Sequence, residues 1–215
     1  MKKFEQELES LKRRVMEMGQ TTEAMVAKST AAVIDRDAGA FEQVLADEAT
    51  LDQFQLEIDG EAVRLITIYT PIAKDLRFLL MVTRINAELE RIGDQAVNNC
   101  EYVQTLSVPP AGPLSDISKM SELTLAMVRD ALTAFDQEDI EMAESVLKND
   151  DDVDQLYNQT FSDLLADPTD DADRLSRSMN LILVARSLER IADHATNICE
   201  EVIYMVNSED IRHKH

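Results

Sequence analysis

The chain has 215 residues, of which 45% are hydrophobic, five are glycine and five are proline. Since a sheet-rich fold needs many tight turns, this scarcity of turn residues favours long helices. The formal net charge of −21, from 42 acidic and 21 basic residues, repels nucleic-acid phosphates and anionic lipids, so we expect no nucleic-acid partner and no direct membrane insertion.

Six helices are predicted in chain order, three in each half of the chain. In the first half we expect helices near 5–36, 38–69 and 73–106, and in the second near 114–136, 139–166 and 170–207. The segment between the halves, residues 107–113, holds three of the five prolines and is predicted to be a linker.

The two halves are copies of one unit. Residues 89–101 read LERIGDQAVNNCE, and residues 188–200 read LERIADHATNICE, with nine of thirteen positions identical. Earlier matches between the halves lie 102 residues apart. A repeat of this kind predicts one structural unit per copy, and short connections predict antiparallel neighbours.

The predicted fold is therefore all-α, with two tandem three-helix bundles related by internal duplication. We place the first repeat at 1–106, the linker at 107–113, the second repeat at 114–207 and a C-terminal tail at 208–215.

The last predicted helix carries a regular apolar seam. Its members follow a spacing of four and three residues, typical of a helix core: Val184, Leu188, Ile191, Ala195, Ile198, Val202 and Met205. The first copy has Asn99 where the second has Ile198. This amide is either a core group with a hydrogen-bond partner or a sign that the seam opens.

A polar stripe runs beside the seam in both copies. Its members are Glu90, Asp94, Asn98 and Glu101 in the first copy and Glu189, Asp193, Asn197 and Glu200 in the second. At about 100° per residue, each set lies on one helix face, where like charges repel one another. The middle helices add the pairs Glu48 and Asp52, and Asp150 and Asp154.

These carboxylates predict a metal site in each bundle, since oxygen-rich sites favour magnesium, manganese, calcium or iron, with zinc a weaker candidate. The main candidates are Glu48, Asp52, Glu90, Asp94, Asp150, Asp154, Glu189 and Asp193, and the lesser ones are Asn98, Glu101, Asn197 and Glu200. Alternatively, nearby arginines neutralise the stripe without metal: Arg84, Arg91, Arg186 and Arg190.

The sequence offers little for catalysis. Only His194, His213 and His215 are histidines, and none has the Glu-x-x-His spacing of a di-iron site inside a helix. No phosphate-binding loop or nucleophile motif occurs. The isolated Cys100 and Cys199 suit buried, reduced thiols of a cytoplasmic protein, and no secretory signal or run of 18 apolar residues is present.

Three blocks resemble the signature of the PhoU family. They are Pro71-x-Ala73-x-Asp75-Leu76-Arg77, the ELERIGD of residues 88–94, and the LERIADHATNI of residues 188–198. The resemblance covers nearly the whole chain. The second copy departs from the pattern, because Ser176 stands where the first copy has Arg77.

The resemblance implies a cytoplasmic, non-enzymatic negative regulator of phosphate uptake and phosphate-starvation signalling. Family members act as adaptors between the ATPase of a phosphate ABC transporter and a sensor histidine kinase. Some bind iron, zinc or other cations through Glu/Asp-x-x-x-Asp steps, here the four pairs named above. A homodimer is expected. The alternatives are a carboxylate-bridged, metal-dependent oxidase and a purely structural helical scaffold.

Overall fold

The computed structural model describes residues 2–35, 38–104, 114–166 and 171–211, which form six α-helices and no strand. The helices are α1 (Lys2–Asp35), α2 (Ala38–Tyr69), α3 (Ala73–Gln104), α4 (Leu114–Gln137), α5 (Ile140–Leu165) and α6 (Ala172–Asn207). The all-α prediction with six helices is confirmed. The expected helix ends at 36, 106 and 170, and the expected linker at 107–113, lie outside the described residues.

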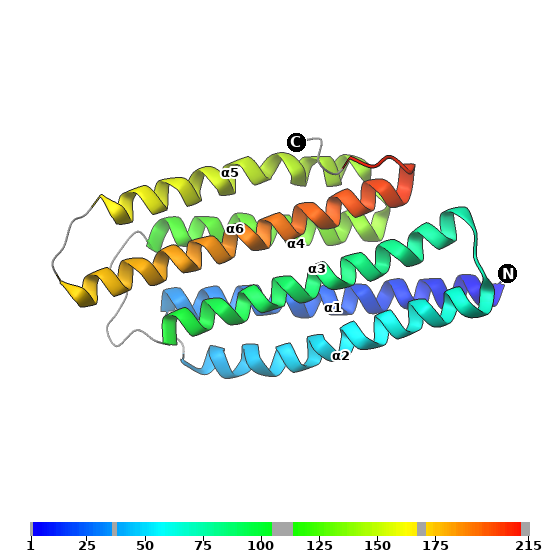
Figure 1. The fold of residues 1–215 in the computed structure, drawn as a ribbon, viewed down its shortest axis with the longest axis horizontal. Helices are drawn as coiled ribbons and strands as arrows, with labels where there is room; N and C mark the ends of the chain where they lie inside the picture. Colours follow the sequence, from blue (N-terminus) through cyan, green and yellow to red (C-terminus); the bar gives the residue numbers. More distant parts are fainter. Residues whose placement is uncertain (1, 36–37, 105–113, 167–170, 212–215) are drawn as a thin grey trace.

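The helices form two bundles that share one core. Helix α2 packs on α1 and α3, and α5 packs on α4 and α6, while the bundles meet through α3 on α6 and α1 on α4. Figure 1 shows α2 and α5 at opposite outer faces, with the other four helices between them. The tandem bundle prediction is thus confirmed.

Side-chain caps fix the start of two helices. Asp139 precedes α5 and accepts a hydrogen bond from the backbone nitrogen of Met142 (3.0 Å). Asp171 precedes α6 and accepts bonds from the nitrogens of Asp173 and Arg174. Both aspartates satisfy backbone amides that have no partner within the helix.

The two bundles pack in opposite directions. In the contact of α1 with α4, Arg129 Nε donates to Glu23 Oε1 (2.9 Å) and Lys12 pairs with Asp136 (3.3 Å), so residue numbers run in opposite senses. Equivalent helices of the two repeats are therefore antiparallel, and the repeats are related by an approximate two-fold axis.

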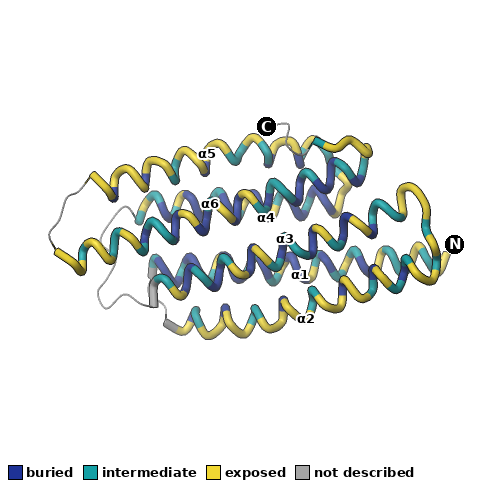
Figure 2. Tube along the Cα trace, viewed as in Figure 1, coloured by how far each residue is buried: buried dark blue, intermediate teal, exposed yellow. Residues whose placement is uncertain are grey.

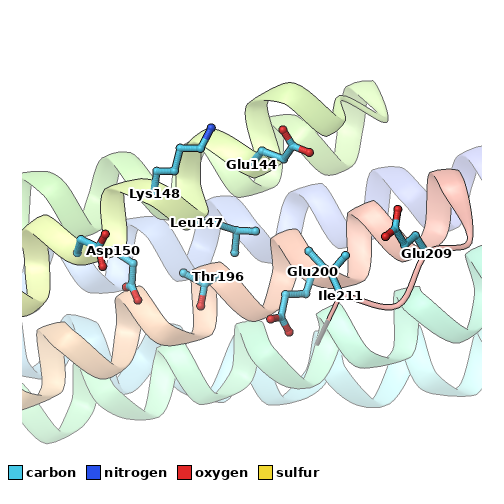
Figure 3. A pocket seen from close by; sticks show the side chains of 9 residues that line it. Glu144, Leu147, Lys148, Asp150, Thr196, Glu200, Glu209 and Ile211 are labelled. Atoms are coloured by element: carbon cyan, nitrogen blue, oxygen red, sulfur yellow. The ribbon is translucent and has the colours of Figure 1, made fainter. Parts of the chain in front are cut away.

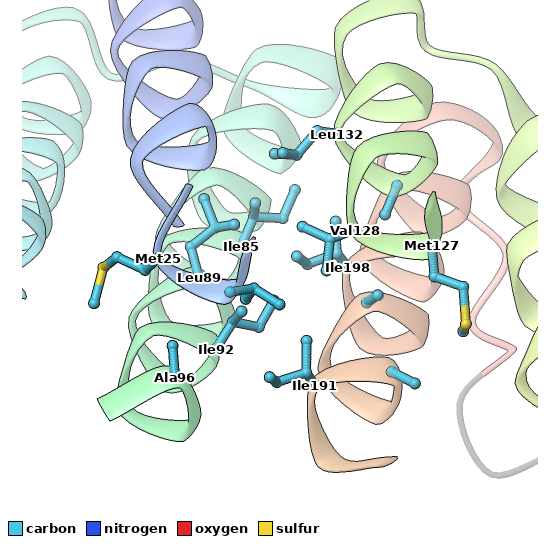
Figure 4. Packing of buried hydrophobic residues seen from close by; sticks show 14 of the residues in the cluster. Met25, Ile85, Leu89, Ile92, Ala96, Met127, Val128, Leu132, Ile191 and Ile198 are labelled. Atoms are coloured by element: carbon cyan, nitrogen blue, oxygen red, sulfur yellow. The ribbon is translucent and has the colours of Figure 1, made fainter. Parts of the chain in front are cut away.

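The apolar seams lie at the centre of this arrangement. All seven seam residues of α6 are buried, as predicted, and they join one hydrophobic cluster with residues of both bundles. Figure 2 shows the buried positions facing inward along every helix, and Figure 4 shows Leu89 and Ile92 of α3 facing Ile191 and Ile198 of α6.

The seam of α3 does not open at Asn99. This residue is fully buried, and neither atom of its side-chain amide has a hydrogen-bond partner among the described residues. Neither expectation for Asn99 therefore holds within the described part of the chain: the seam stays closed, and the buried amide has no hydrogen-bond partner there.

Gly93 allows α3 to pack closely on its neighbours. A Cβ at this position would lie closer than 3.0 Å to Leu51 Cδ2 of α2 and 3.5 Å from Met25 Cε of α1. In the second repeat the equivalent residues are Ala192 and Val153, both fully buried. The first copy thus pairs glycine with leucine, and the second pairs the larger alanine with the smaller valine.

Candidate functional site

The predicted carboxylates of the first repeat lie on the paired helices α2 and α3. Asn86 of α3 fixes the register, since its Nδ2 donates to the carbonyl of Gln55 and to Asp59 Oδ1, both at 3.0 Å. Leu51 of α2 packs at Gly93, seven residues after Asn86 along α3. Because the helices are antiparallel, this register sets Asp52 beside the turn that carries Asp94.

We call Glu48, Asp52, Glu90 and Asp94 the first cluster. Partial burial, together with the charges of Asp52, Asp94 and Glu101, raises the pKa of Glu48. Burial and the charges of Asp94 and Asp52 raise the pKa of Glu90, and burial with Asp52 raises that of Asp94. The four carboxylates are therefore brought close enough to repel one another.

The second cluster consists of Asp150, Asp154, Glu189 and Asp193, on α5 and α6. Burial and the charges of Asp193, Asp154 and Glu189 raise the pKa of Asp150 to about 7. The pKa values of Glu189 and Asp193 are raised too, through burial first and neighbouring carboxylates second. The predicted pairs thus come together in both repeats.

A groove of about 600 Å³ lies beside the second cluster, between α5 and α6. Figure 3 shows Lys148 on its α5 side, Thr196 and Glu200 on α6, and Ile211 after the end of α6. Asp150 also lines it. The C-terminal segment supplies one wall of the groove through Glu209 and Ile211.

The arginines only partly offset the carboxylate charge. Arg91 lowers the pKa of Glu90, and Arg186 and Arg190 lower that of Glu189, but both values remain raised overall. Arg91 forms its ion pair with Glu88 instead (2.6 Å), and Arg84 pairs with Glu201 (3.1 Å). Neutralisation by arginine alone is therefore incomplete.

The clusters supply the oxygen atoms that hard cations prefer, but their present geometry does not form a closed site. Among the described residues, no three His, Cys, Asp or Glu side chains converge closely enough to hold a metal ion. Of the lesser candidates, Glu101 faces Glu48, Glu200 lines the groove and Asn98 is half-buried. Asn197 points to the other bundle.

A polar link between the bundles was missed by the sequence reasoning. His194 Nδ1 lies 2.7 Å from Glu88 Oε2, and Asn197 Nδ2 donates to the same oxygen at 3.0 Å. Burial would raise the pKa of Glu88, but these two bonds and the charges of His194 and Arg91 outweigh it and hold the pKa below its ordinary value. His194 thus lies at the core edge, in contact with α3.

The available signal was an absence of symmetry. Glu88 and His194 each lack a repeat equivalent of the same type, because Ser187 and Gln95 stand at those positions. Two unmatched polar residues on helices that face each other indicate a contact, but only once the packing of the repeats is known.

The thiols do not add reactivity to these faces. Burial and the charge of Glu101 raise the pKa of Cys100 to about 11, and burial raises that of Cys199 further. Neither is a thiolate at neutral pH, so both are small apolar core groups. None of the described helices combines the length and apolar character needed to cross a membrane.

Comparison with known proteins places this arrangement in a family. The family model described as PhoU domain matches twice, at residues 15–103 and 117–202. The chain is 37% identical over 216 residues to the phosphate-specific transport system accessory protein PhoU homolog of Aquifex aeolicus, covering 100% of this chain and 97% of that one. It is 35% identical over 212 residues to the homolog of Pseudomonas aeruginosa, covering 98% and 88%.

Solved structures agree. The crystal structure of PhoU from Pseudomonas aeruginosa superposes with a TM-score of 0.91 at 34% identity, over 96% of this chain and 100% of that one. The PhoU of Streptococcus pneumoniae gives 0.89 at 26% identity, over 96% and 98%. Both repeats are matched, and the relatives are covered over most of their length, so the chain belongs to the PhoU family.

Proposed function

We propose that this protein is a cytoplasmic, non-enzymatic accessory regulator of a phosphate-specific transport system. The observation that carries the proposal is the match along both repeats to relatives named as accessory proteins of such a system, over nearly the full length of both chains. In this role it restrains phosphate uptake and represses phosphate-starvation genes when phosphate is plentiful.

The proposed mode of action is that of an adaptor with two partners. One is the ATPase subunit of the phosphate ABC transporter, and the other is a sensor histidine kinase. Two bundles, each with a partly exposed acidic cluster, suit simultaneous contact with more than one protein surface. We also propose that the chain forms a homodimer, which sedimentation equilibrium tests.

A reconstitution tests the adaptor. The purified chain is mixed with the ATPase subunit and with the cytosolic region of the kinase, singly and together, and complexes are sized by sedimentation velocity. We expect a complex that contains all three proteins and a kinase autophosphorylation rate that falls only when the chain is present. Binding to neither protein refutes the adaptor.

A cellular experiment tests the regulatory role separately. Deleting the gene should derepress a phosphate-starvation reporter in phosphate-rich medium, and the wild-type gene should restore repression. A reporter that stays repressed after deletion contradicts the proposal regardless of the binding results.

We further propose that the two clusters bind a divalent or trivalent cation, such as iron, zinc, manganese or magnesium. Mutual repulsion among the carboxylates supports this, since a cation relieves it. Binding requires the side chains to turn toward one ion, because no three converge as they lie. The metal would order a helix face, and no step of the proposed function passes through it.

Elemental mass spectrometry of tag-free protein tests metal binding. The variant replaces four cluster residues by alanine: Glu90, Asp94, Glu189 and Asp193. The control replaces four exposed acids elsewhere: Glu9, Glu42, Glu122 and Glu141. We expect metal in the native chain and the control, and none in the folded variant. The same metal content in all three places the metal elsewhere.

A further inference from the structure

Exposed apolar side chains gather on the two helix faces that carry the clusters. On the first face these are Leu56 and Val63 of α2 and Leu80 of α3, and on the second they are Phe161, Leu165, Leu175 and Met179. Each exposes between 39% and 69% of its surface. Single exposed leucines are ordinary on a protein, but groups of them next to charged residues mark interaction sites.

Helix geometry sets these apolar residues in line with the carboxylates. Val63 follows Asp52 by eleven residues, which is about 20° around the helix and about 16 Å along it. Leu80 precedes Asp94 by fourteen residues, about 40° around α3. The first face therefore presents carboxylates at its centre and an apolar patch toward the end of the α2–α3 hairpin.

The second face repeats this layout. Leu165 follows Asp154 by eleven residues, the spacing of Val63 and Asp52, and Met179 precedes Asp193 by fourteen, the spacing of Leu80 and Asp94. Exposure of a large apolar residue has thus been retained at the same places of both copies, where a solvated surface would not require it.

The antiparallel packing of the repeats then sets the two patches at opposite ends of the molecule. In Figure 1 the α2–α3 hairpin lies at the right end, whereas the end of α5 and the start of α6 lie at the left end. Since an approximate two-fold axis relates the repeats, one chain offers the same surface twice, in two-fold related positions.

We propose that the two faces together form one docking surface for a two-fold symmetric protein. To each face this partner presents apolar side chains and, about 16 Å away, basic side chains that meet the cluster. A partner with two-fold symmetry offers identical surfaces in the arrangement that the chain repeats, and engaging both at once increases affinity without any new kind of contact.

Charge selects this partner over a lipid surface. The carboxylates repel one another within each cluster, so a basic partner relieves a repulsion already present. Of the cations near the first patch, Arg64 pairs with Glu7 and Glu61, Lys74 pairs with Glu138, and Arg77 donates to the backbone carbonyl of Met205. An anionic membrane would meet the carboxylates of the two clusters, whose charge repels its headgroups.

The inference rests on the proposed adaptor function, because the probes are its two partners. The affinity of the chain for the cytosolic region of the kinase and for the ATPase subunit is measured by calorimetry, each probe first being sized alone. The first-face variant is Val63→Ser with Leu80→Ser, and the second-face variant is Leu165→Ser with Met179→Ser. Ile68→Ser is the control, since this exposed residue lies about 160° from Asp52 around α2.

We expect each single-face variant to weaken binding of the two-fold symmetric probe by about tenfold or more, and the combined variant to abolish it. The control should stay within about twofold of the native chain. The stoichiometry should be one chain per partner dimer. Urea unfolding checks that each variant is folded, and the exposed positions of the substitutions favour this.

Several outcomes overturn the inference. If the native chain binds a probe and both single-face variants bind it with the same affinity, the docking surface is refuted but the adaptor proposal stands. A measured stoichiometry of two chains per partner dimer refutes the proposal that one chain engages both halves of a two-fold symmetric partner. Binding of the native chain to neither probe removes the adaptor and this inference together.

Two other occupants are tested with the same variants. Flotation with vesicles of phosphatidylglycerol and phosphatidylethanolamine that captures the native chain but not the variants would assign the patches to a membrane. Self-association of the native chain that both single-face variants lose would assign them to a second copy. Either result overturns the proposal.

Discussion

The contact between Gly93 and Leu51 provides a test of how the two repeats solve the same packing problem. In the first repeat the absence of a Cβ at Gly93 leaves room for the larger Leu51, whereas the second repeat has Ala192 and Val153 at these positions. We predict that Gly93→Ala destabilises the chain, and that Leu51→Val rescues it by copying the arrangement of the second repeat.

The magnitudes follow from three effects. Alanine gains about 1 kcal/mol over glycine in helix propensity, while overpacking against the buried Leu51 costs about 2 kcal/mol, so Gly93→Ala loses about 1 kcal/mol. Leu51→Val alone loses about 1 kcal/mol through the missing methylene and the space it leaves. In the double variant the clash is gone, and the propensity gain offsets the lost methylene of about 0.8 kcal/mol.

Urea unfolding followed by circular dichroism measures the four proteins of this double-mutant cycle. Additivity predicts a loss of about 2 kcal/mol for the double variant, whereas we expect almost none, a coupling of about 2 kcal/mol. The mirror cycle, Ala192→Gly with Val153→Leu, should show the same coupling. Additive losses within about 0.5 kcal/mol would refute the packing argument.

Three further changes test the electrostatics. Asp150 has a folded-state pKa of about 7, above its ordinary 3.8, so its contribution to stability is full at low pH and is lost as pH rises through 7. Asp150→Asn should therefore match the native chain near pH 4 and be more stable by about 1–2 kcal/mol near pH 8, after allowance for solvent screening. Glu88 has a lowered pKa, so its contribution is present at neutral pH and is lost as pH falls through the folded value. Glu88→Gln should cost about 1–2 kcal/mol near pH 7 through the weakened bond to His194, with a smaller difference in acid. Arg84→Ala removes an ion-pair partner from the buried Glu201 and should cost about 1 kcal/mol.

All three are read from urea unfolding in the presence of a chelator, so that no bound cation contributes. Asp152→Asn and Glu122→Gln serve as controls at exposed positions and should change stability little at any pH. A native-like Asp150→Asn near pH 8, or a constant effect of Glu88→Gln across pH, contradicts the pKa assignments. If Arg84→Ala leaves the free energy of unfolding unchanged, other contacts satisfy the Glu201 carboxylate without Arg84.

The helices and their order were predictable because turn-forming residues are scarce in this chain and lie mainly between the predicted helices. Pro71 and Pro168 each precede a third helix of a repeat, and the repeated LER-I-D blocks fixed the equivalence of the halves. The seam of α6 was predicted residue by residue, since its spacing leaves one buried face. Local pattern and tertiary burial agree here, so sequence suffices.

How the two repeats meet was not predictable. A duplication says that two units are alike but not whether they pack parallel or antiparallel, which depends on the shapes of both faces. The link from Glu88 to His194 follows from that packing and was therefore missed. The approach of the acidic pairs was anticipated, yet their closure around an ion was not testable from spacing, because it depends on side-chain torsions.

The antiparallel contact of α1 with α4 and of α3 with α6 is the contact that two half-length chains would make on dimerising. Joining them in one polypeptide raises their effective concentration to the order of millimolar, so association no longer depends on protein level. The fusion also frees each half to change alone, where a homodimer must carry every substitution twice. Two changes of this kind are Asn99, where the second repeat has Ile198, and Glu88, where the second repeat has Ser187. The bond from Glu88 to His194 could thus arise on one side of the axis only.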